Sequence, residues 1–228
     1  MDNMYSGEYT PPTLTVDGVI FQLIDDQLYV LLIQRSKEPF KGAWALPGGY
    51  NAAGETTKEA MERVLKRKTG VSSRDLEYVE QLFTFDTVAR DPRGHAVSVT
   101  YMGVGTNITP KESSTTQNPG FFPVNELPEL AYDHNNIIQY GVERLRSKLT
   151  YTNAAYALLP ALFTLSQLQA AYEAVFGHEF DKRNFRKKFL SLDLVEETTE
   201  MFKEGAHRPA RLYRFKQQKL HALERSFD

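Results

Sequence analysis

The sequence predicts an α/β protein in two parts, an α/β/α sandwich built on a mixed sheet followed by a helix-turn-helix with a two-stranded wing. Strand-like apolar runs alternate with amphipathic helical segments through the first 150 residues, a pattern typical of a sheet covered by helices. After that point, two helical segments precede two short β-rich runs. A chain of 228 residues is long enough for two modest domains, which we place at 1–150 and 151–228.

The composition is that of an ordinary globular protein, with 41% hydrophobic and 25% charged residues. There are no cysteines, which excludes a disulfide framework, a cysteine zinc finger and a thiol nucleophile. No apolar run approaches the roughly 18 residues of a membrane span. The first residues, MDNMYSGEYTPP, lack the basic and then apolar layout of a signal peptide. We therefore expect a cytoplasmic protein without a membrane partner.

Charge is distributed unevenly along the chain. The net charge is −2, made up of −4 over residues 1–150 and +2 over residues 151–228. The segment DKRNFRKK (181–188) concentrates five basic residues on one predicted helix. A local basic surface matters more for an anionic partner than the sum over the chain.

In the first part, a hairpin is expected around Asp25-Asp26, because two β-rich runs flank this turn-forming pair. The expected strands are 14–24, 27–35, 76–86 and 98–105, with a loop at 111–120 and a helix at 135–148. Residues 44–71 read as strand, glycine turn and helix. Gly48 and Gly49 are expected to form a tight turn where the backbone approaches a ligand, and the helix starts at Thr56 and stops at Gly70.

The 44–71 segment resembles the Nudix box of hydrolases that act on nucleoside diphosphates linked to another group. The residues in register with that box are Gly49, Glu55, Arg63, Leu65, Gly70 and Val71. The three glutamates that follow the arginine in the family are replaced here by Val64, Arg67 and Lys68.

These replacements bear directly on catalysis. In active members of the family, carboxylates on one helix face hold the divalent cations that bridge the pyrophosphate. Hard cations such as Mg²⁺ need oxygen ligands, which Arg67 and Lys68 cannot supply. Glu59 and Glu62 remain nearby, either as solvated helix charges or as part of a relocated metal site. The expectation is a ligand-binding domain without catalytic residues, metal or cofactor.

The second part begins its helices at two capping residues. Thr164 is a candidate N-cap for a helix that closes at Gly177, and Asp181 is a candidate N-cap for a helix over 182–192. Residues 194–202 and 211–215 then predict two strands around a basic turn. This order is the winged helix-turn-helix layout.

DNA is the partner that this layout favours. If the aromatic side chains of the second helix face the core, its basic side chains are free to enter a major groove. The candidate DNA-binding residues are Lys182, Arg183, Asn184, Arg186 and Lys187 on the helix, and Arg208 and Arg211 in the wing. The alternative is that this basic helix is merely a solvated amphipathic one.

Together the two parts resemble the Nudix-related transcriptional regulators of bacteria. The resemblance rests on RDPRG (90–94), VSVTY (97–101), AYDHNNII (131–138), LLPALFTLSQLQAAYEAVFG (158–177), DKRNFRKK and GAHRPARLYRF (205–215). It implies a homodimer on palindromic operator DNA, usually a repressor that a small molecule releases. In members that govern NAD metabolism, that effector is ADP-ribose or a related nucleotide. In other branches, a sugar controls sugar-catabolism genes.

The candidate effector-binding residues lie mainly around the 44–71 segment. They are Arg35, Phe40, Trp44, Gly48, Gly49, Arg63, Arg67, Lys68, Asp86 and Arg90. Several have structural alternatives: Phe40 and Trp44 as core or lid residues, and Arg63 as a salt-bridge partner within its helix. Asp91 and Asp133 are expected to cap turns, and His134 to orient a loop or an interface.

Two other function classes remain open on the sequence. One is an active Nudix hydrolase of ADP-ribose-like substrates with an accessory domain, and the other is a nucleotide-binding scaffold that touches no DNA. For the regulator, effector binding in the first domain is expected to shift a two-state equilibrium and so change the affinity for DNA. A coupling of about 1–3 kcal/mol would suffice.

Overall fold

A seven-stranded mixed sheet forms the body of the first part, as the sequence predicts. The computed structural model describes residues 10–112, 117–203, 209–224 and 226–227. The strands of the sheet are β1 (Thr13–Ile24), β2 (Gln27–Gln34), β3 (Trp44–Ala45), β4 (Gly48–Tyr50), β5 (Tyr78–Phe85), β6 (Ala96–Val104) and β7 (Gln117–Pro123). The helices of this part are α1 (Thr57–Thr69), the short η1 (Ser73–Asp75) and α2 (His134–Tyr151).

Strand β1 is the central strand that makes the sheet mixed. It pairs antiparallel with β2 around the predicted Asp25-Asp26 turn and parallel with β6 along nine residue pairs, from Thr13 opposite Ala96 to Phe21 opposite Val104. The strand order is β3-β2-β1-β6-β5, while β4 adds to β1 and β7 adds to β2. The expected α/β/α sandwich is confirmed.

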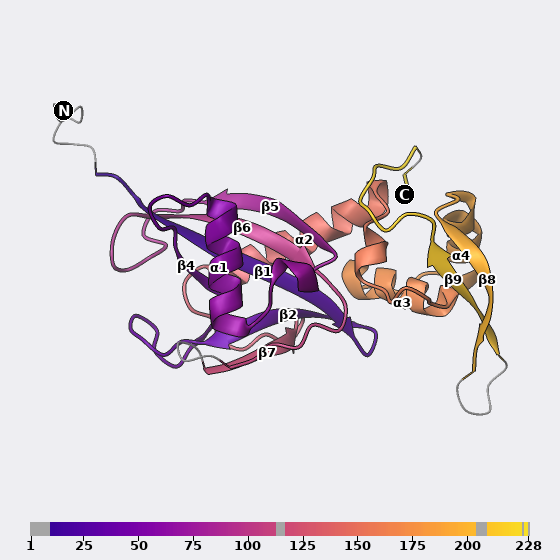
Figure 1. Cartoon of the computed structure of the whole chain (residues 1–228), viewed down its shortest axis with the longest axis horizontal. Helices are drawn as coiled ribbons and strands as arrows, with labels where there is room; N and C mark the ends of the chain where they lie inside the picture. The colour runs from indigo at the N-terminus through magenta and orange to yellow at the C-terminus, as the bar shows by residue number, and fades with distance from the viewer. Residues whose placement is uncertain (1–9, 113–116, 204–208, 225, 228) are drawn as a thin grey trace.

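The two faces of β1 bury two separate sets of side chains. Val16 and Ile20 pack in the cluster under α1, whereas Val19 and Phe21 pack in the cluster under α2. Successive strand residues point to opposite faces, so an apolar strand of this kind needs a cover on each face. Helix α1 covers one face and α2 covers the other, as Figure 1 shows.

Helix α1 starts and stops where the sequence predicts. Thr56 and Glu59 form a reciprocal capping box, and Gly70 ends the helix in the left-handed region at φ 72°. The buried face of the helix includes Met61, Val64 and Leu65.

Two local predictions were wrong. The expected loop over 111–120 contains the start of β7, because Gln117–Pro123 pairs with the outer edge of β2. The expected glycine turn is the short strand β4, in which Gly48 lies opposite Asp17 and Gly49 opposite Val16. A Cβ at Gly48 would collide with the Asp17 carboxylate, so glycine is needed here for close packing of two strands.

The second part has the predicted winged helix-turn-helix layout. Its elements are α3 (Leu165–Phe176), α4 (Lys182–Ser191), β8 (Val195–Phe202) and β9 (Ala210–Phe215), preceded by the short η2 (Ala154–Ala157). Thr164 caps α3 through a capping box with Gln167, and the Asp181 carboxylate accepts from the Asn184 backbone N–H to cap α4. Strands β8 and β9 form the antiparallel wing.

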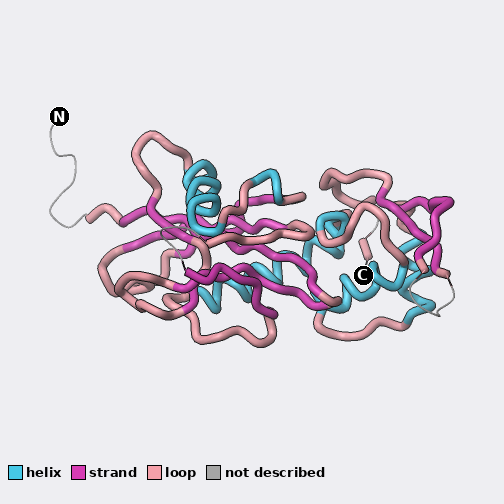
Figure 2. The backbone as a smooth tube through the Cα atoms, turned by 60° about the horizontal axis from the view of Figure 1, so that its bottom comes forward, coloured by secondary structure: helices cyan, strands magenta, loops and turns pink. Residues whose placement is uncertain are grey.

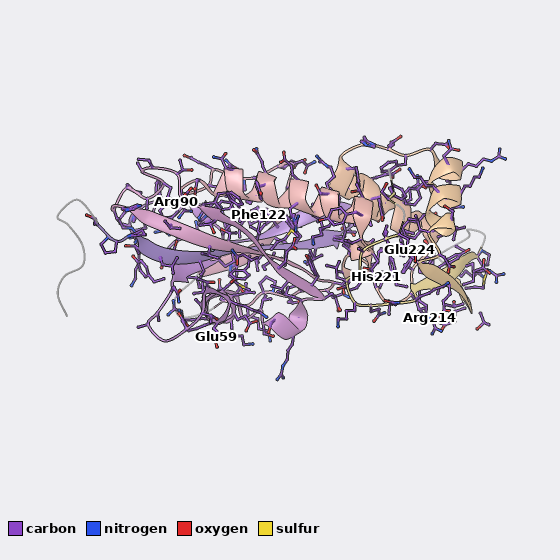
Figure 3. The ribbon with its side chains drawn as sticks, turned by 90° about the horizontal axis from the view of Figure 1, so that it is seen from above. Glu59, Arg90, Phe122, Arg214, His221 and Glu224 are labelled. Atoms are coloured by element: carbon purple, nitrogen blue, oxygen red, sulfur yellow. The ribbon has the colours of Figure 1, made fainter. Side chains whose placement is uncertain are left out.

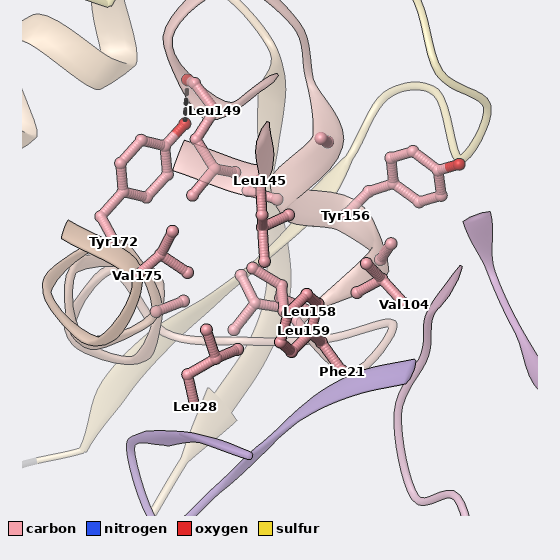
Figure 4. Close-up of a cluster of buried hydrophobic side chains, with 14 of the residues drawn as sticks. Phe21, Leu28, Val104, Leu145, Leu149, Tyr156, Leu158, Leu159, Tyr172 and Val175 are labelled. Carbon is pink, nitrogen blue, oxygen red and sulfur yellow. Dashed lines mark hydrogen bonds between the residues drawn. The ribbon is translucent and has the colours of Figure 1, made fainter. Parts of the chain in front are cut away.

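A continuous apolar core joins the two parts. Phe21 and Leu28 of the sheet belong to the same buried cluster as Leu149 of α2 and Tyr172 of α3. Figure 4 shows these side chains together with the hydrogen bond from the Tyr172 hydroxyl to the Leu149 carbonyl, 3.3 Å long.

The last described residues return to this junction. The Phe227 ring lies among the rings of Tyr172, Phe180 and Phe185, and the Phe227 N–H donates to the Thr150 carbonyl at 2.7 Å. Figure 2 shows the tail passing back beside the helices of the second part. The helices within the described ranges are all too short or too polar to span a membrane.

Candidate functional site

A cavity of about 460 Å³ opens at one end of the sheet, beside α1 and the start of α2. Its charged lining residues are Arg35, Lys37, Arg67, Lys68, Arg90 and Arg93 on the basic side and Asp17, Glu38 and Asp91 on the acidic side. The volume falls within the range of about 300–1,000 Å³ typical of small-molecule sites. With six cations against three carboxylates, the cavity suits an anionic ligand.

Arg67 and Lys68 bring two of these cations from the last turn of α1. Among the described residues, neither side chain has a hydrogen-bond or ion-pair partner in the protein. Burial above all lowers the pKa of the Lys68 ammonium, Asp17 opposes this, and the charges of Arg35 and Arg67 add to it, so that the pKa is about 8. At neutral pH Lys68 is therefore still mostly protonated and available to an anion.

Arg90 lines the cavity and pairs with Asp133, the residue that precedes α2. Its Nε and Nη2 donate to the two Asp133 carboxylate oxygens at 2.9 and 2.8 Å, and Nη2 also lies 3.7 Å from Asp17 Oδ2. Only 5% of the Arg90 side chain is exposed. Figure 3 labels Arg90 near the beginning of α2, with Glu59 of α1 on the other side of the sheet.

His134, the first residue of α2, fixes the wall of the cavity next to Leu46. Its Nδ1 accepts the Leu46 backbone N–H at 2.9 Å, so the other ring nitrogen carries the proton and lies 3.7 Å from Asp17 Oδ1. Burial lowers the pKa of His134, which keeps the ring neutral. Of the two predicted roles for His134, loop orientation is the one that this contact describes.

The predicted effector-binding residues divide into two groups. Those that line the cavity are Arg35, Gly48, Gly49, Arg67, Lys68 and Arg90, and those that do not are Phe40, Trp44, Arg63 and Asp86. The second group lies outside this cavity, and its part in effector binding stays a prediction. Trp44 packs on Phe122 with ring centroids 4.5 Å apart, because its strand turns the indole to the core.

The other three residues have partners or positions outside the cavity. Phe40 packs against Tyr132, whose other contacts include the Arg35 guanidinium at 4.8 Å from the ring centre. Arg63 forms a salt bridge, but its partner Glu55 precedes α1 and does not lie within the helix, as the alternative had expected. Asp86 follows β5 and is exposed.

Sequence reasoning missed several residues of the cavity wall, above all Asp17, Tyr50, Arg93 and Tyr132. Asp17 had one signal, since it is a charged residue inside an apolar strand run. Its carboxylate accepts from Ser98 at 2.5 Å and faces Arg90. Asp91 caps a turn as expected, because its Oδ1 accepts the Arg93 backbone N–H at 3.0 Å, and it also holds Arg93 through two side-chain hydrogen bonds. Asp133, also expected to cap a turn, makes no side-chain cap and pairs with Arg90.

Two glutamates of the box segment, Glu55 and Glu59, form hydrogen bonds near the start of α1. Glu55 accepts from Arg63 and from the Ala52 N–H, and these hydrogen bonds lower its pKa to about 2. Glu59 is held by the Thr56 cap, which lowers its pKa as well. Across the described ranges, no three acidic or histidine side chains gather closely enough to hold a metal ion.

The second surface is the exposed side of α4. Phe185 and Phe189 are buried, which leaves Lys182, Arg183, Asn184 and Lys187 exposed to solvent. Arg186 differs from its neighbours, since it is half-buried and donates to the Ser166 hydroxyl of α3 at 3.0 Å.

The wing offers fewer free charges than its sequence indicated. Arg211 lies 3.2 Å from Glu197 on the neighbouring strand, and Arg214 pairs with Glu196. Both pairs are exposed, and such pairs exchange readily for other partners because they contribute only about 0–1 kcal/mol. The predicted wing residue Arg208 lies outside the described residues.

Two family models match the chain, one to each part. Residues 13–141 match the NUDIX domain, and residues 155–215 match the NrtR DNA-binding winged helix domain. A curated relative from Acinetobacter baylyi, the "ADPR responsive transcriptional repressor NtrR", is 36% identical over 91% of this chain and 84% of its own length. The chain belongs to the Nudix-related transcriptional regulators. Our domain boundary after residue 150 falls between the two matched ranges and stays a prediction.

Solved structures from the same family share the whole architecture. Shewanella oneidensis NrtR in complex with a 27mer DNA is 33% identical, covers 94% of this chain and 99% of its own, and superposes with a TM-score of 0.78. The NUDIX domain of that regulator, solved with ADP ribose, is 36% identical over 62% of this chain and 94% of its own, with a TM-score of 0.55.

The Nudix domain also has enzyme relatives. An ADP-ribose pyrophosphatase from Methanocaldococcus jannaschii is 37% identical over 58% of this chain and 73% of its own length. The shared region therefore does not by itself separate a regulator from a hydrolase, and the chemistry of positions 64, 67 and 68 has to decide.

Proposed function

We propose that this protein is a DNA-binding transcriptional repressor whose Nudix domain binds ADP-ribose and thereby releases operator DNA. The observation that carries the proposal is the cavity itself. Arg67 and Lys68, which have no ion-pair partner among the described residues, stand where a Nudix hydrolase has metal-binding glutamates. Cationic side chains can bind a pyrophosphate directly, without a metal ion as a bridge. Without that metal ion, however, the water that hydrolyses the pyrophosphate is not activated. The family relatives that respond to ADP-ribose and bind DNA support this reading.

The DNA side of the proposal rests on α4. The helix buries Phe185 and Phe189 in the core and exposes Lys182, Arg183 and Lys187. Its basic side chains can therefore contact DNA without any change in the core. Asn184 is exposed on the same helix and fits bidentate readout of an adenine. We infer that two copies bind a palindromic operator, since a recognition helix from each protomer reaches successive major grooves. Control of NAD metabolism genes follows from ADP-ribose as the signal.

The deciding experiment is fluorescence anisotropy with DNA fragments from upstream of the neighbouring genes, with and without ADP-ribose. The proposal predicts tight, salt-dependent, sequence-specific binding that ADP-ribose weakens by at least about fivefold. Binding that ignores ADP-ribose but responds to a sugar would keep the repressor and replace its effector. Absence of specific binding at low and moderate salt would contradict the repressor itself.

Hydrolysis is the second candidate, and the identity to an ADP-ribose pyrophosphatase favours it. Glu59 is engaged in the α1 cap and Glu55 in the Arg63 pair, which argues against a metal site on these two carboxylates. We therefore expect no AMP release from ADP-ribose with Mg²⁺ above the rate of the protein-free control. Release that disappears in Glu55→Gln would establish the enzyme instead.

Metal independence gives a further test of the cavity. Because Arg67 and Lys68 take the place of the ions, ADP-ribose is expected to bind with unchanged affinity when EDTA replaces Mg²⁺ in calorimetry. A requirement for Mg²⁺ would contradict this account of the site.

A further inference from the structure

We propose that Asp133 couples the cavity to α2. In this proposal, ligand binding makes the Asp133 carboxylate release the Arg90 guanidinium and accept hydrogen bonds from the N–H groups of the first turn of α2. The inference rests on the proposed function, because it assigns the step between ADP-ribose binding and DNA release. In the structure, Arg90 and Asp133 form a bidentate pair in which only 5% and 14% of the side chains are exposed.

Asp133 occupies the N-cap position of α2 but does not cap the helix. No side-chain cap hydrogen bond is made there, and its φ of −92° and ψ of 19° lie outside the extended conformation usual for an N-cap. The carboxylate that would accept the N–H groups of the first turn is held by Arg90 instead. In this backbone conformation Asp133 therefore holds Arg90 and leaves the N–H groups of the first turn without a side-chain cap.

An anionic ligand changes the balance between these partners. Arg90 lines the cavity, and a pyrophosphate oxygen competes with the Asp133 carboxylate for the same guanidinium N–H groups. Asp17, 3.7 Å from Arg90, adds further negative charge on the protein side of the contact. When phosphate takes Arg90, the Asp133 carboxylate becomes free to cap α2, which requires its backbone to rotate and so redirects the helix.

Helix α2 carries this change to the DNA-binding domain. Its 18 residues span roughly 27 Å, from the cavity to the core that it shares with α3. At the far end, Arg146 donates to the Val175 carbonyl of α3 at 3.3 and 3.2 Å, and the Leu149 carbonyl accepts the Tyr172 hydroxyl. A cavity of about 490 Å³ between α2 and the end of α3, lined in part by Val142 and Glu173, leaves room for a shift.

The substitution Asp133→Asn tests the exchange directly. Asparagine caps helices about as well as aspartate but cannot form the ion pair with Arg90. In this variant, α2 is therefore expected to be capped whether or not the ligand is bound. DNA affinity without effector is expected to fall toward that of the ADP-ribose complex. ADP-ribose affinity is expected to rise, because Arg90 no longer has to be released. The ratio of DNA dissociation constants with and without ADP-ribose should drop below about threefold, against the 5–150-fold typical of allosteric coupling.

Glu55→Gln is the matched control, since it also neutralises a carboxylate that pairs with an arginine, here Arg63, but lies outside the cavity lining and makes no contact with α2 among the described residues. Its coupling ratio is expected to equal that of the wild type.

Arg90→Lys provides a second variant, which keeps a cation for the phosphate and loses the bidentate pair. It should bind ADP-ribose while the coupling ratio falls. A wild-type coupling ratio in folded Asp133→Asn or in Arg90→Lys would overturn the inference alone. A wild-type protein whose DNA binding ignores ADP-ribose would overturn the proposed function as well.

Discussion

At the scale of single residues, the proposed function depends on Arg67 and Lys68, two cations at positions where the Nudix box has carboxylates. Arg67 and Lys68 were recognisable from the register of the box, because a fixed motif spacing assigns each position to one face of a helix. Asp17 and Asp133 were not recognisable as partners of Arg90. Their contacts join residues distant in the sequence, 43 positions apart for Arg90 and Asp133, and no local pattern encodes such a pair.

The lowered pKa of Lys68 makes a prediction about pH. Because the ammonium loses its proton as the pH passes about 8, affinity for ADP-ribose is expected to fall between pH 7 and pH 9. Calorimetry across this range should show Lys68→Met binding more weakly at pH 7, by roughly 10–100-fold for a lost charge-assisted hydrogen bond of about 1.5–3 kcal/mol. The variant should also lose the pH dependence. An unchanged pH dependence in Lys68→Met would show that another group titrates.

The lowered pKa of Lys68 also affects the stability of the fold. The contribution to stability is expected to rise with pH, whereas the affinity for ADP-ribose is expected to fall. The unfolded chain holds the Lys68 proton up to its ordinary pKa of 10.5, whereas the folded chain releases it near 8. Between these values the unfolded state binds more protons, so the contribution of Lys68 to stability rises with pH. The burial cost of the cation is therefore present at pH 7 and relieved above pH 8.

At the scale of secondary-structure elements, α4 is the element whose role is easiest to test. Arg183→Ala removes an exposed cation and leaves Phe185 and Phe189 in the core, so it is expected to weaken operator binding by about tenfold or more. ADP-ribose affinity should not change. Arg74→Ala, which removes another exposed arginine in η1, is the control for loss of charge. Equal DNA affinity in both variants would contradict the role of α4.

Arg186 is expected to behave differently from Arg183. Its guanidinium is tied to Ser166 on α3, so Arg186→Ala should lower the thermal midpoint of unfolding as well as DNA affinity. Arg183→Ala should leave that midpoint unchanged. A midpoint in Arg186→Ala equal to that of the wild type would show that the contact with α3 adds nothing to stability.

The C-terminal tail is an element that the sequence did not reveal. Capping residues such as Thr164 and Asp181 mark helix starts locally, and these starts were confirmed. Strand β7 and the tail have no such signals, since their structure depends on β2 and on the aromatic core. Phe227 is only 6% exposed although it is the penultimate residue of the sequence.

Phe227→Ala is therefore expected to destabilise the protein by about 3 kcal/mol or more, because it empties a site among buried rings. Urea denaturation followed by circular dichroism measures the loss. Phe227→Leu, which keeps most of the volume, should cost clearly less. If Phe227→Ala unfolds at the wild-type urea concentration, the tail does not form part of the core.

At the scale of the whole molecule, the two domains share one buried cluster and are linked by one helix. The sequence pattern predicted a boundary after residue 150 but gave no sign that Phe21 and Tyr172 belong to a common core. Periodicity reveals which face of an element is apolar, but it does not identify what packs there. The proposed communication between the cavity and α4 runs through this shared core.

A shared core also predicts cooperative unfolding. Trp44 is the only tryptophan and reports on the Nudix domain, whereas circular dichroism follows helices in both domains. The two signals are expected to give the same thermal midpoint, and ADP-ribose should raise both together. Separate midpoints would show that the domains unfold independently.

The most direct test of the account is reciprocity between its two ligands. ADP-ribose is titrated by calorimetry into the protein alone and into the protein saturated with operator DNA. If the cavity and α4 are coupled, DNA must weaken ADP-ribose binding by the same factor by which ADP-ribose weakens DNA binding, since both factors express one coupling free energy. Equal ADP-ribose affinity with and without DNA would contradict the claim that the Nudix domain controls the DNA-binding domain.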